Sequence, residues 1–255
     1  MERLGNTKPS GMNANGLRAW GMIFVVAGII SRSVLQNRFL GVGSITGAEL
    51  VQVMQASQNA MYIATAALVL QAMETCAVPI FAFLLVEGFR KAESPKAYAI
   101  WVALVAVVSE IPYNLAMSQK VLDLSSRNPA VGLLLGLALL YLYRRFEGKK
   151  AICVIATIAG FAWAWMLGID HGAAMVLMIA TMWLLRKKPA VRSFVGAAVG
   201  VLCTIGSMFY LAAPMGFLAI HFYNGEEGAD NQIVNMVFYP VVLLVIGLVV
   251  MFVLP

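Results

Sequence analysis

Residues 233–254 read IVNMVFYPVVLLVIGLVVMFVL and contain no charged side chain. A helix needs about 20 mostly apolar residues to cross the roughly 30 Å hydrocarbon layer of a bilayer. This run therefore predicts a transmembrane helix. Comparable apolar runs recur along the rest of the chain, at residues 17–31, 60–89, 97–118, 129–143, 151–169, 172–185 and 194–213.

The composition agrees with this interpretation, because 61% of the residues are hydrophobic and 12% are charged, whereas soluble domains carry about 25% charged residues. We therefore expect an all-α integral membrane protein, a bundle of about eight transmembrane helices in a single polytopic domain over residues 1–255. A signal peptide is the alternative for residues 17–31. We disfavour it because Arg32 follows directly and no small-x-small cleavage site is present.

The basic residues predict an orientation. Cytoplasmic loops of membrane proteins carry an excess of Lys and Arg, and an eight-helix path puts most of the 18 basic residues on one side. Both termini are then cytoplasmic, in the bacterial inner (plasma) membrane, and residues 214–232 form an outer loop. The basic residues lie between apolar runs and form no broad basic face, so nucleic acid is not expected as a partner. The cytoplasmic set is Arg3, Lys8, Arg18, Arg90, Lys91, Lys96, Arg144, Arg145, Lys149, Lys150, Arg186, Lys187, Lys188 and Arg192.

Several ionisable residues interrupt the apolar runs, where each charge costs roughly 2.5–3.5 kcal/mol on insertion scales. Glu110 stands two residues before Pro112, which opens the helix locally, and this favours a functional role. Glu74 is either functional or a neutral, hydrogen-bonded side chain, and Glu87 either has a role or simply pairs with Arg90. Asp170 and the following histidine are either functional or solvated residues of a tight outer turn.

Together these segments resemble the TraX family, membrane proteins named for a conjugative-transfer acetyltransferase that acetylates the N-terminus of pilin. The resemblance covers about residues 75–245. It rests on VPIFAFLLVEGFR (78–90), SEIPYN (109–114), Asn128 before a Leu- and Gly-rich run, DHG (170–172), YNG (223–225) with Gly228, and FYP (238–240).

The resemblance implies a membrane-bound acetyltransferase that takes acetyl from cytoplasmic acetyl-CoA to an acceptor amine or hydroxyl, such as a peptide N-terminus, a sugar or a small molecule. Two histidines that family members often carry are absent: residues 25–31 lack an Asp-His pair, and Val242 stands where a histidine often follows the FYP motif. A catalytically inactive TraX-like protein is therefore one alternative, and a transporter or channel with buried carboxylates is another.

An acyl transfer needs a base, and an imidazole with a carboxylate partner is the usual solution. We expect His171 to act with Asp170 or Glu110 as the catalytic residues. No metal is expected, and the three cysteines show no metal-ligand or disulfide spacing. Substrate contacts are expected from Glu74, Asn114, Asn128, Tyr223, Asn224 and Tyr239, of which Asn114, Asn128 or Tyr239 would stabilise an oxyanion. Contacts to acetyl-CoA are expected from Glu87, Arg90, Lys91, Arg144 and Arg145.

Overall fold

The computed structural model describes residues 11–42, 47–123, 125–228 and 232–254, and these form an all-helical bundle without strands. Two residues of the predicted cytoplasmic basic set, Arg3 and Lys8, lie outside the described residues. The same is true of residues 229–231 in the predicted outer loop. The helices are α1 (Ala14–Ile29), η1 (Ile30–Phe39), α2 (Gly47–Ala56), α3 (Gln58–Thr75), α4 (Ala77–Lys91), α5 (Pro95–Ser118), α6 (Pro129–Arg145), α7 (Lys150–Met166), α8 (Gly172–Leu184), α9 (Pro189–Leu202), η2 (Cys203–Ile205), η3 (Met208–Met215), α10 (Gly216–His221) and α11 (Gln232–Phe252).

Polar caps and prolines fix where several of these helices begin. The side chains of Asn13, Ser57, Ser94 and Asn128 accept hydrogen bonds from the first turns of α1, α3, α5 and α6. Such caps satisfy backbone donors that a helix start leaves unpaired. In α5 and α6 a proline follows the cap, where its missing N–H group costs nothing.

Four stretches of the described chain are long and apolar enough to cross a membrane: Ala14–Phe39, Gln58–Lys91, Pro95–Ser118 and Ile233–Phe252. The first continues past the expected end at residue 31 because Ile30–Phe39 form the wider turns of η1. The second is interrupted at Cys76, between α3 and α4. Pro79 lies four residues after Thr75 and cannot donate to its carbonyl group, which accounts for the break.

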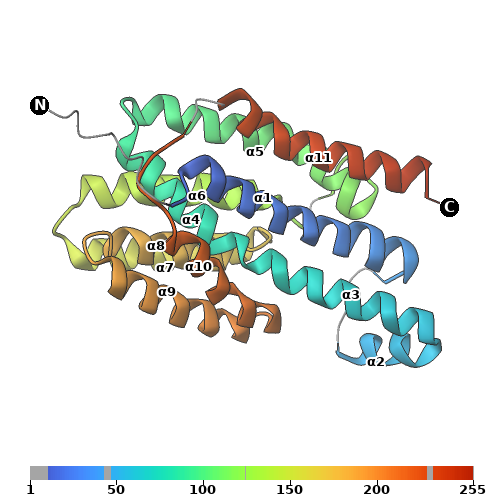
Figure 1. The fold of residues 1–255 in the computed structure, drawn as a ribbon. Helices are drawn as coiled ribbons and strands as arrows, with labels where there is room; N and C mark the ends of the chain where they lie inside the picture. The colour runs from blue at the N-terminus through green and yellow to red at the C-terminus, as the bar shows by residue number, and fades with distance from the viewer. Residues whose placement is uncertain (1–10, 43–46, 124, 229–231, 255) are drawn as a thin grey trace, which may run out of the picture.

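The remaining apolar runs form shorter helices that occupy one half of the bundle (Figure 1). Helix α8, which corresponds to the apolar run 172–185, is buried along most of its length. It packs with α4 in the main core, where Phe89 meets Trp183 and Tyr141 edge to face. Apolar side chains such as Val107 and Ile155 face outwards, as expected in contact with lipid. The prediction of an all-α membrane bundle is confirmed.

One end of the bundle, which we call the basic end, carries the start of α1 and the loops after α4, α6 and α8. Here the backbones of Met12 and Tyr223 form an isolated parallel β-bridge. The Lys91 ammonium group donates hydrogen bonds to the Tyr223 hydroxyl group and to the Gly225 carbonyl group. At the opposite end, which we call the far end, Arg38 donates to the carbonyl group of Leu254. The described chain therefore begins and ends at opposite ends of the bundle (Figure 1).

This arrangement differs from the predicted path, which put both termini on one side and residues 214–232 on the other. The run 194–213 is not one continuous span. Helix α9 ends at Leu202, Ser207 is extended, and α10 leads back to the basic end. The segment around Tyr223 therefore shares an end with the basic loops, and the last helix runs from there to the far end.

Candidate active site

Glu74 lies in the last turn of α3, directly before the break at Cys76, and its side chain is 5% exposed. The break is fixed from a distant part of the chain. The Thr75 hydroxyl group donates to the Phe209 carbonyl group at 3.0 Å, and the Cys76 thiol donates to the Ala212 carbonyl group at 3.2 Å. The carboxylate is thus held at the middle of the bundle, where only other protein groups can compensate its charge.

Asp170 and His171 form the turn between α7 and α8, and this turn lies inside the bundle. The Asp170 N–H group donates to the Arg127 carbonyl group at 2.9 Å, which anchors the turn to the segment before α6. His171 adopts a left-handed backbone conformation with a φ of 55°. Their side chains are 19% and 15% exposed. The alternative of solvated residues in an outer turn does not fit this burial.

Arg32, in η1, joins the two carboxylates. Its Nη2 atom lies 2.6 Å from Oε1 of Glu74, and its Nη1 atom donates to Oδ2 of Asp170. Asp170 also accepts a hydrogen bond of 3.1 Å from the hydroxyl group of Tyr113. Arg32 was not among the residues that the sequence predicted for the site. The signal that could have identified it was the need of two buried acids for a nearby cation.

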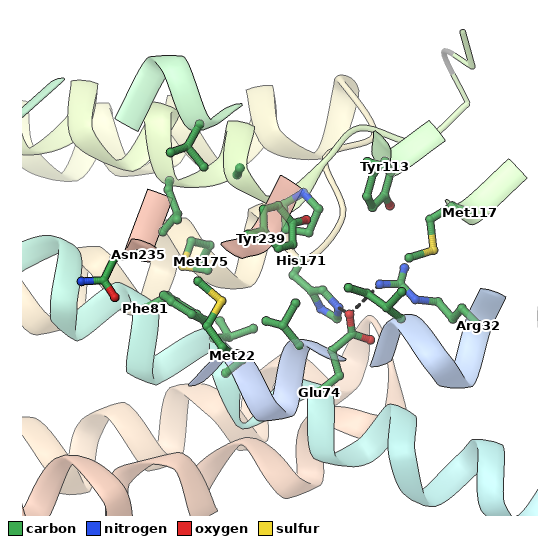
Figure 2. A pocket seen from close by; sticks show the side chains of 18 residues that line it. Met22, Arg32, Glu74, Phe81, Tyr113, Met117, His171, Met175, Asn235 and Tyr239 are labelled. Carbon is green, nitrogen blue, oxygen red and sulfur yellow. Dashed lines mark hydrogen bonds and ion pairs between the residues drawn. The ribbon is translucent and has the colours of Figure 1, made fainter. Parts of the chain in front are cut away.

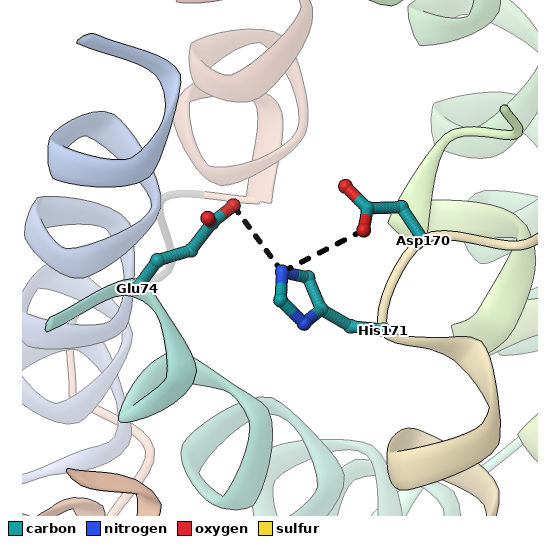
Figure 3. Close-up of side chains that lie close together, drawn as sticks. All are labelled: Glu74, Asp170 and His171. Carbon is teal, nitrogen blue, oxygen red and sulfur yellow. Dashed lines mark ion pairs between the residues drawn. The ribbon is translucent and has the colours of Figure 1, made fainter. Parts of the chain in front are cut away.

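The imidazole ring of His171 lies between the two carboxylates (Figure 3). Its Nε2 atom is 3.5 Å from Oε1 of Glu74 and 3.8 Å from Oδ1 of Asp170, and it has no hydrogen-bond partner among the described residues. Its Nδ1 atom lies 2.6 Å from the hydroxyl group of Tyr210, in η3. Tyr210 did not figure in the sequence-based site. One ring nitrogen is therefore fixed, and the other remains available beside two negative charges.

A cavity of about 100 Å³ adjoins this cluster, and His171, Glu74 and Arg32 line it (Figure 2). Tyr113 and Tyr239 also contribute to its wall, which is otherwise mostly apolar. At the side nearer the basic end the wall includes Asn235, which donates to Asn15 at 3.2 Å. The cavity thus brings the imidazole into contact with a sheltered space large enough for a small reacting group.

The family model described as TraX protein matches residues 50–250. The chain belongs to the TraX family. The matched region contains Glu74, Asp170 and His171, whereas Arg32 lies before it. No curated protein and no solved structure matches this TraX-family chain.

Glu110 lies outside the cluster in this TraX protein. Its nearest charged partner is Arg127, at 3.7 Å, and it does not line the cavity. The carboxylates beside His171 are those of Glu74 and Asp170, so the expected pairing of His171 with Glu110 is not formed.

Among the expected oxyanion donors, Asn128 and Tyr239 are engaged with each other. The Tyr239 hydroxyl group donates to Oδ1 of Asn128 at 2.9 Å, and the Asn128 amide donates to Ser109 at 2.5 Å. This network joins α11, α6 and α5 at the cavity wall. Asn114 is buried on α5 but does not line the cavity.

The residues expected to contact acetyl-CoA gather at the basic end of the TraX bundle, and none of them lines the cavity. Glu87 pairs with Arg90 at 3.3 Å, which is the simple pairing that the sequence left open. Arg144 lies over the ring of Phe89, and Arg145 is exposed. Tyr223 and Asn224 also lie at this end, beside the basic loops, whereas the predicted path put them at the opposite end.

Glu74, Asp170 and His171 each offer a ligand atom within 4.8 Å of the others, a grouping that could hold a metal ion. Arg32 already pairs with one oxygen of each carboxylate. A metal cation at this point would compete with the guanidinium group for the same charges. The arrangement is better described as an ion-paired carboxylate and imidazole cluster than as a metal centre.

Proposed function

We propose that this TraX-family protein is a membrane-bound acyltransferase that transfers acetyl from acetyl-CoA to an acceptor amine or hydroxyl group. The observation that carries the proposal is the Nε2 atom of His171, which lies between Glu74 and Asp170 at the wall of a cavity and makes no hydrogen bond to the described residues. An imidazole placed in this way can take a proton from an acceptor and return it to a leaving group.

The proton transfers follow from the contacts of the ring. With Nδ1–H donating to Tyr210, the Nε2 lone pair accepts the proton of the acceptor as its nitrogen or oxygen attacks the thioester carbonyl carbon. Glu74 and Asp170 stabilise the imidazolium ion that forms. The carbon–sulfur bond then breaks, and Nε2 returns the proton to the thiolate of CoA, which leaves as the thiol.

The tetrahedral intermediate carries a negative oxygen that needs a donor. The Nε–H group of Arg32 has no hydrogen-bond partner in the described part of the chain, and Arg32 lines the same cavity. We assign this group to the oxyanion, in place of Asn128 and Tyr239, which already pair with each other. The other two nitrogens of the guanidinium group keep the carboxylates in position.

The basic end supports the choice of a CoA thioester as donor, because phosphate groups bind to clusters of Arg and Lys. Arg18 donates to Asn15 at 2.7 Å, and Asn15 accepts from Asn235 of the cavity wall. A line of polar contacts therefore leads from the basic end to the cavity.

The two histidines of the chain provide a matched test. His171→Gln removes the base, and we expect release of CoA thiol from acetyl-CoA to fall at least 100-fold in purified protein in nanodiscs, as for the loss of a general base. His221 is exposed at the basic end, so His221→Gln should retain activity. Equal activity of both variants would refute the assignment of the base, and absence of acetyl transfer in the unaltered protein would refute the function.

A further inference from the structure

The cavity beside His171 has an uneven distribution of polarity. The charged groups that line it, Arg32, Glu74 and His171, lie together (Figure 2). Asn235 lies well away from them, beside Phe81 and Met22. The wall between these groups is formed by apolar side chains from α1, α4, α5, α6 and α8, among them Met22, Val78, Phe81, Val105, Leu133 and Met175.

Such a wall selects the chemistry of what enters it. An amide or hydroxyl group placed against Val78, Leu133 and Met175 has no hydrogen-bond partner in these side chains, so its removal from water is unfavourable. A hydrocarbon chain has no polar group to desolvate, and the burial of each of its methylene groups stabilises the complex. The apolar part of the cavity therefore fits an alkyl chain better than it fits the amide-containing arm of a coenzyme.

The volume of the cavity limits how much of a hydrocarbon chain it can enclose. An apolar cavity of about 150 Å³ in another protein binds a six-carbon ring. By simple proportion, the cavity of about 100 Å³ accommodates about four carbons. An acetyl group by itself would leave half of this space unfilled.

We infer that the cavity binds a short, unbranched hydrocarbon chain of about four carbons attached to one of the two reactants, next to the group that meets His171. The inference rests on the proposed acyl transfer for the identity of the reacting group. The chain belongs either to the acyl group of the thioester or to the alkyl part of the acceptor, and the chemistry of the site is the same in both cases.

Two series of compounds distinguish these sources when binding to the protein in nanodiscs is measured, with empty nanodiscs as the blank. The first comprises CoA, acetyl-CoA, butanoyl-CoA and octanoyl-CoA, and the second comprises ethylamine, butylamine and octylamine. In the series that fills the cavity, affinity should rise about fourfold for each added methylene group up to about four carbons and then stop rising. An affinity independent of chain length in both series would overturn the inference.

Two valines of α5 give a matched pair of variants. Val105 lines the cavity, whereas Val107 is 71% exposed on the outer face. Val105→Phe should abolish the gain in affinity with chain length, whereas Val107→Phe should leave that gain as it is in the unaltered protein. If Val105→Phe weakens CoA as much as butanoyl-CoA, the cavity holds the coenzyme arm, and the inference is wrong.

Met22→Ala also tests whether the cavity determines the preferred chain length, by making the cavity larger. This variant does not require the fold to accommodate a larger side chain. It enlarges the cavity, so the preferred chain should become longer by two or three carbons, as expected for loss of the methionine side chain. An unchanged preference would also count against the inference. These measurements report binding, so chain-length dependence without acetyl transfer would overturn the proposed function alone.

Discussion

Arg32 and Glu74 are joined by an ion pair of 2.6 Å between η1 and the last turn of α3. The two residues are 42 positions apart, and the Glu74 side chain is 5% exposed. The same guanidinium group holds Asp170, so one cation fixes the two carboxylates on either side of His171. Both the stability of the bundle and the geometry of the imidazole therefore depend on Arg32.

Arg32→Gln should strongly destabilise the protein, because it leaves the carboxylates of Glu74 and Asp170 buried without their cation. Loss of one partner of a buried pair costs about 3–5 kcal/mol. Thermal unfolding in detergent should show this loss, and Glu74→Gln introduced in the same protein should restore part of it. Additive effects of the two substitutions would mean that the pair is not coupled.

Tyr210→Phe should lower kcat about tenfold with little change in KM for acetyl-CoA. The hydroxyl group of Tyr210 contacts Nδ1 of His171 at 2.6 Å and holds the imidazole ring in its orientation. A lost hydrogen bond worth about 1.4 kcal/mol corresponds to this factor. Tyr62 is 58% exposed on α3, so Tyr62→Phe provides the control. A rise in KM at constant kcat would place Tyr210 in substrate binding instead.

Gly28→Ala should be destabilising, although alanine normally favours a helix over glycine by about 1 kcal/mol. A Cβ atom at Gly28 would lie 2.0 Å from the side chain of Glu74, which cannot move without breaking its pair with Arg32. At Gly160 the nearest side-chain atom would lie 3.4 Å away, an ordinary contact. Gly160→Ala should therefore be neutral or stabilising in the same unfolding experiment. Equal effects of the two substitutions would contradict the tight packing around Glu74.

Arg90→Ala and Arg144→Ala should each weaken binding of acetyl-CoA about fivefold at low ionic strength and less at high salt, because exposed charges are screened. The control is Lys120→Ala, in the exposed loop after α5, away from the basic end. Calorimetric titration at two salt concentrations measures both effects. If neither Arg90→Ala nor Arg144→Ala weakens binding at low salt, the phosphate groups of CoA do not bind at these residues.

Cysteine labelling can test the arrangement of the chain across the membrane. Lys149→Cys and Glu227→Cys introduce thiols at exposed positions of the basic end, and Lys120→Cys introduces one in the loop after α5. A membrane-impermeant reagent should reach the first two from the same side and the third from the other side. Labelling of Glu227→Cys from the side opposite Lys149→Cys would support the outer loop that the sequence predicted.

The amino-acid sequence determined the class of the protein and the start of several helices. Apolar runs long enough for a bilayer predict helices by themselves, because an unpaired backbone is too costly in lipid. Asn128 with Pro129 and Ser94 with Pro95 are local signals of a helix start, and the structure uses both. The motif with Asp170 and His171 directed attention to the turn that now lies at the centre of the candidate site.

Tertiary structure alone decided which groups meet in that site. Arg32 and Asp170 are 138 positions apart, and Tyr210 reaches His171 only because the chain reverses after Leu202. Hydropathy and capping depend on neighbours in the chain, so they are visible in the sequence. The pairing of buried charges depends on how helices pack. The sequence alone would also allow Glu74 and Asp170 to pair with Arg127, which instead lies near Glu110, or with another cation. Packing selected Arg32, because η1, the end of α3 and the turn before α8 converge at the same depth in the bundle.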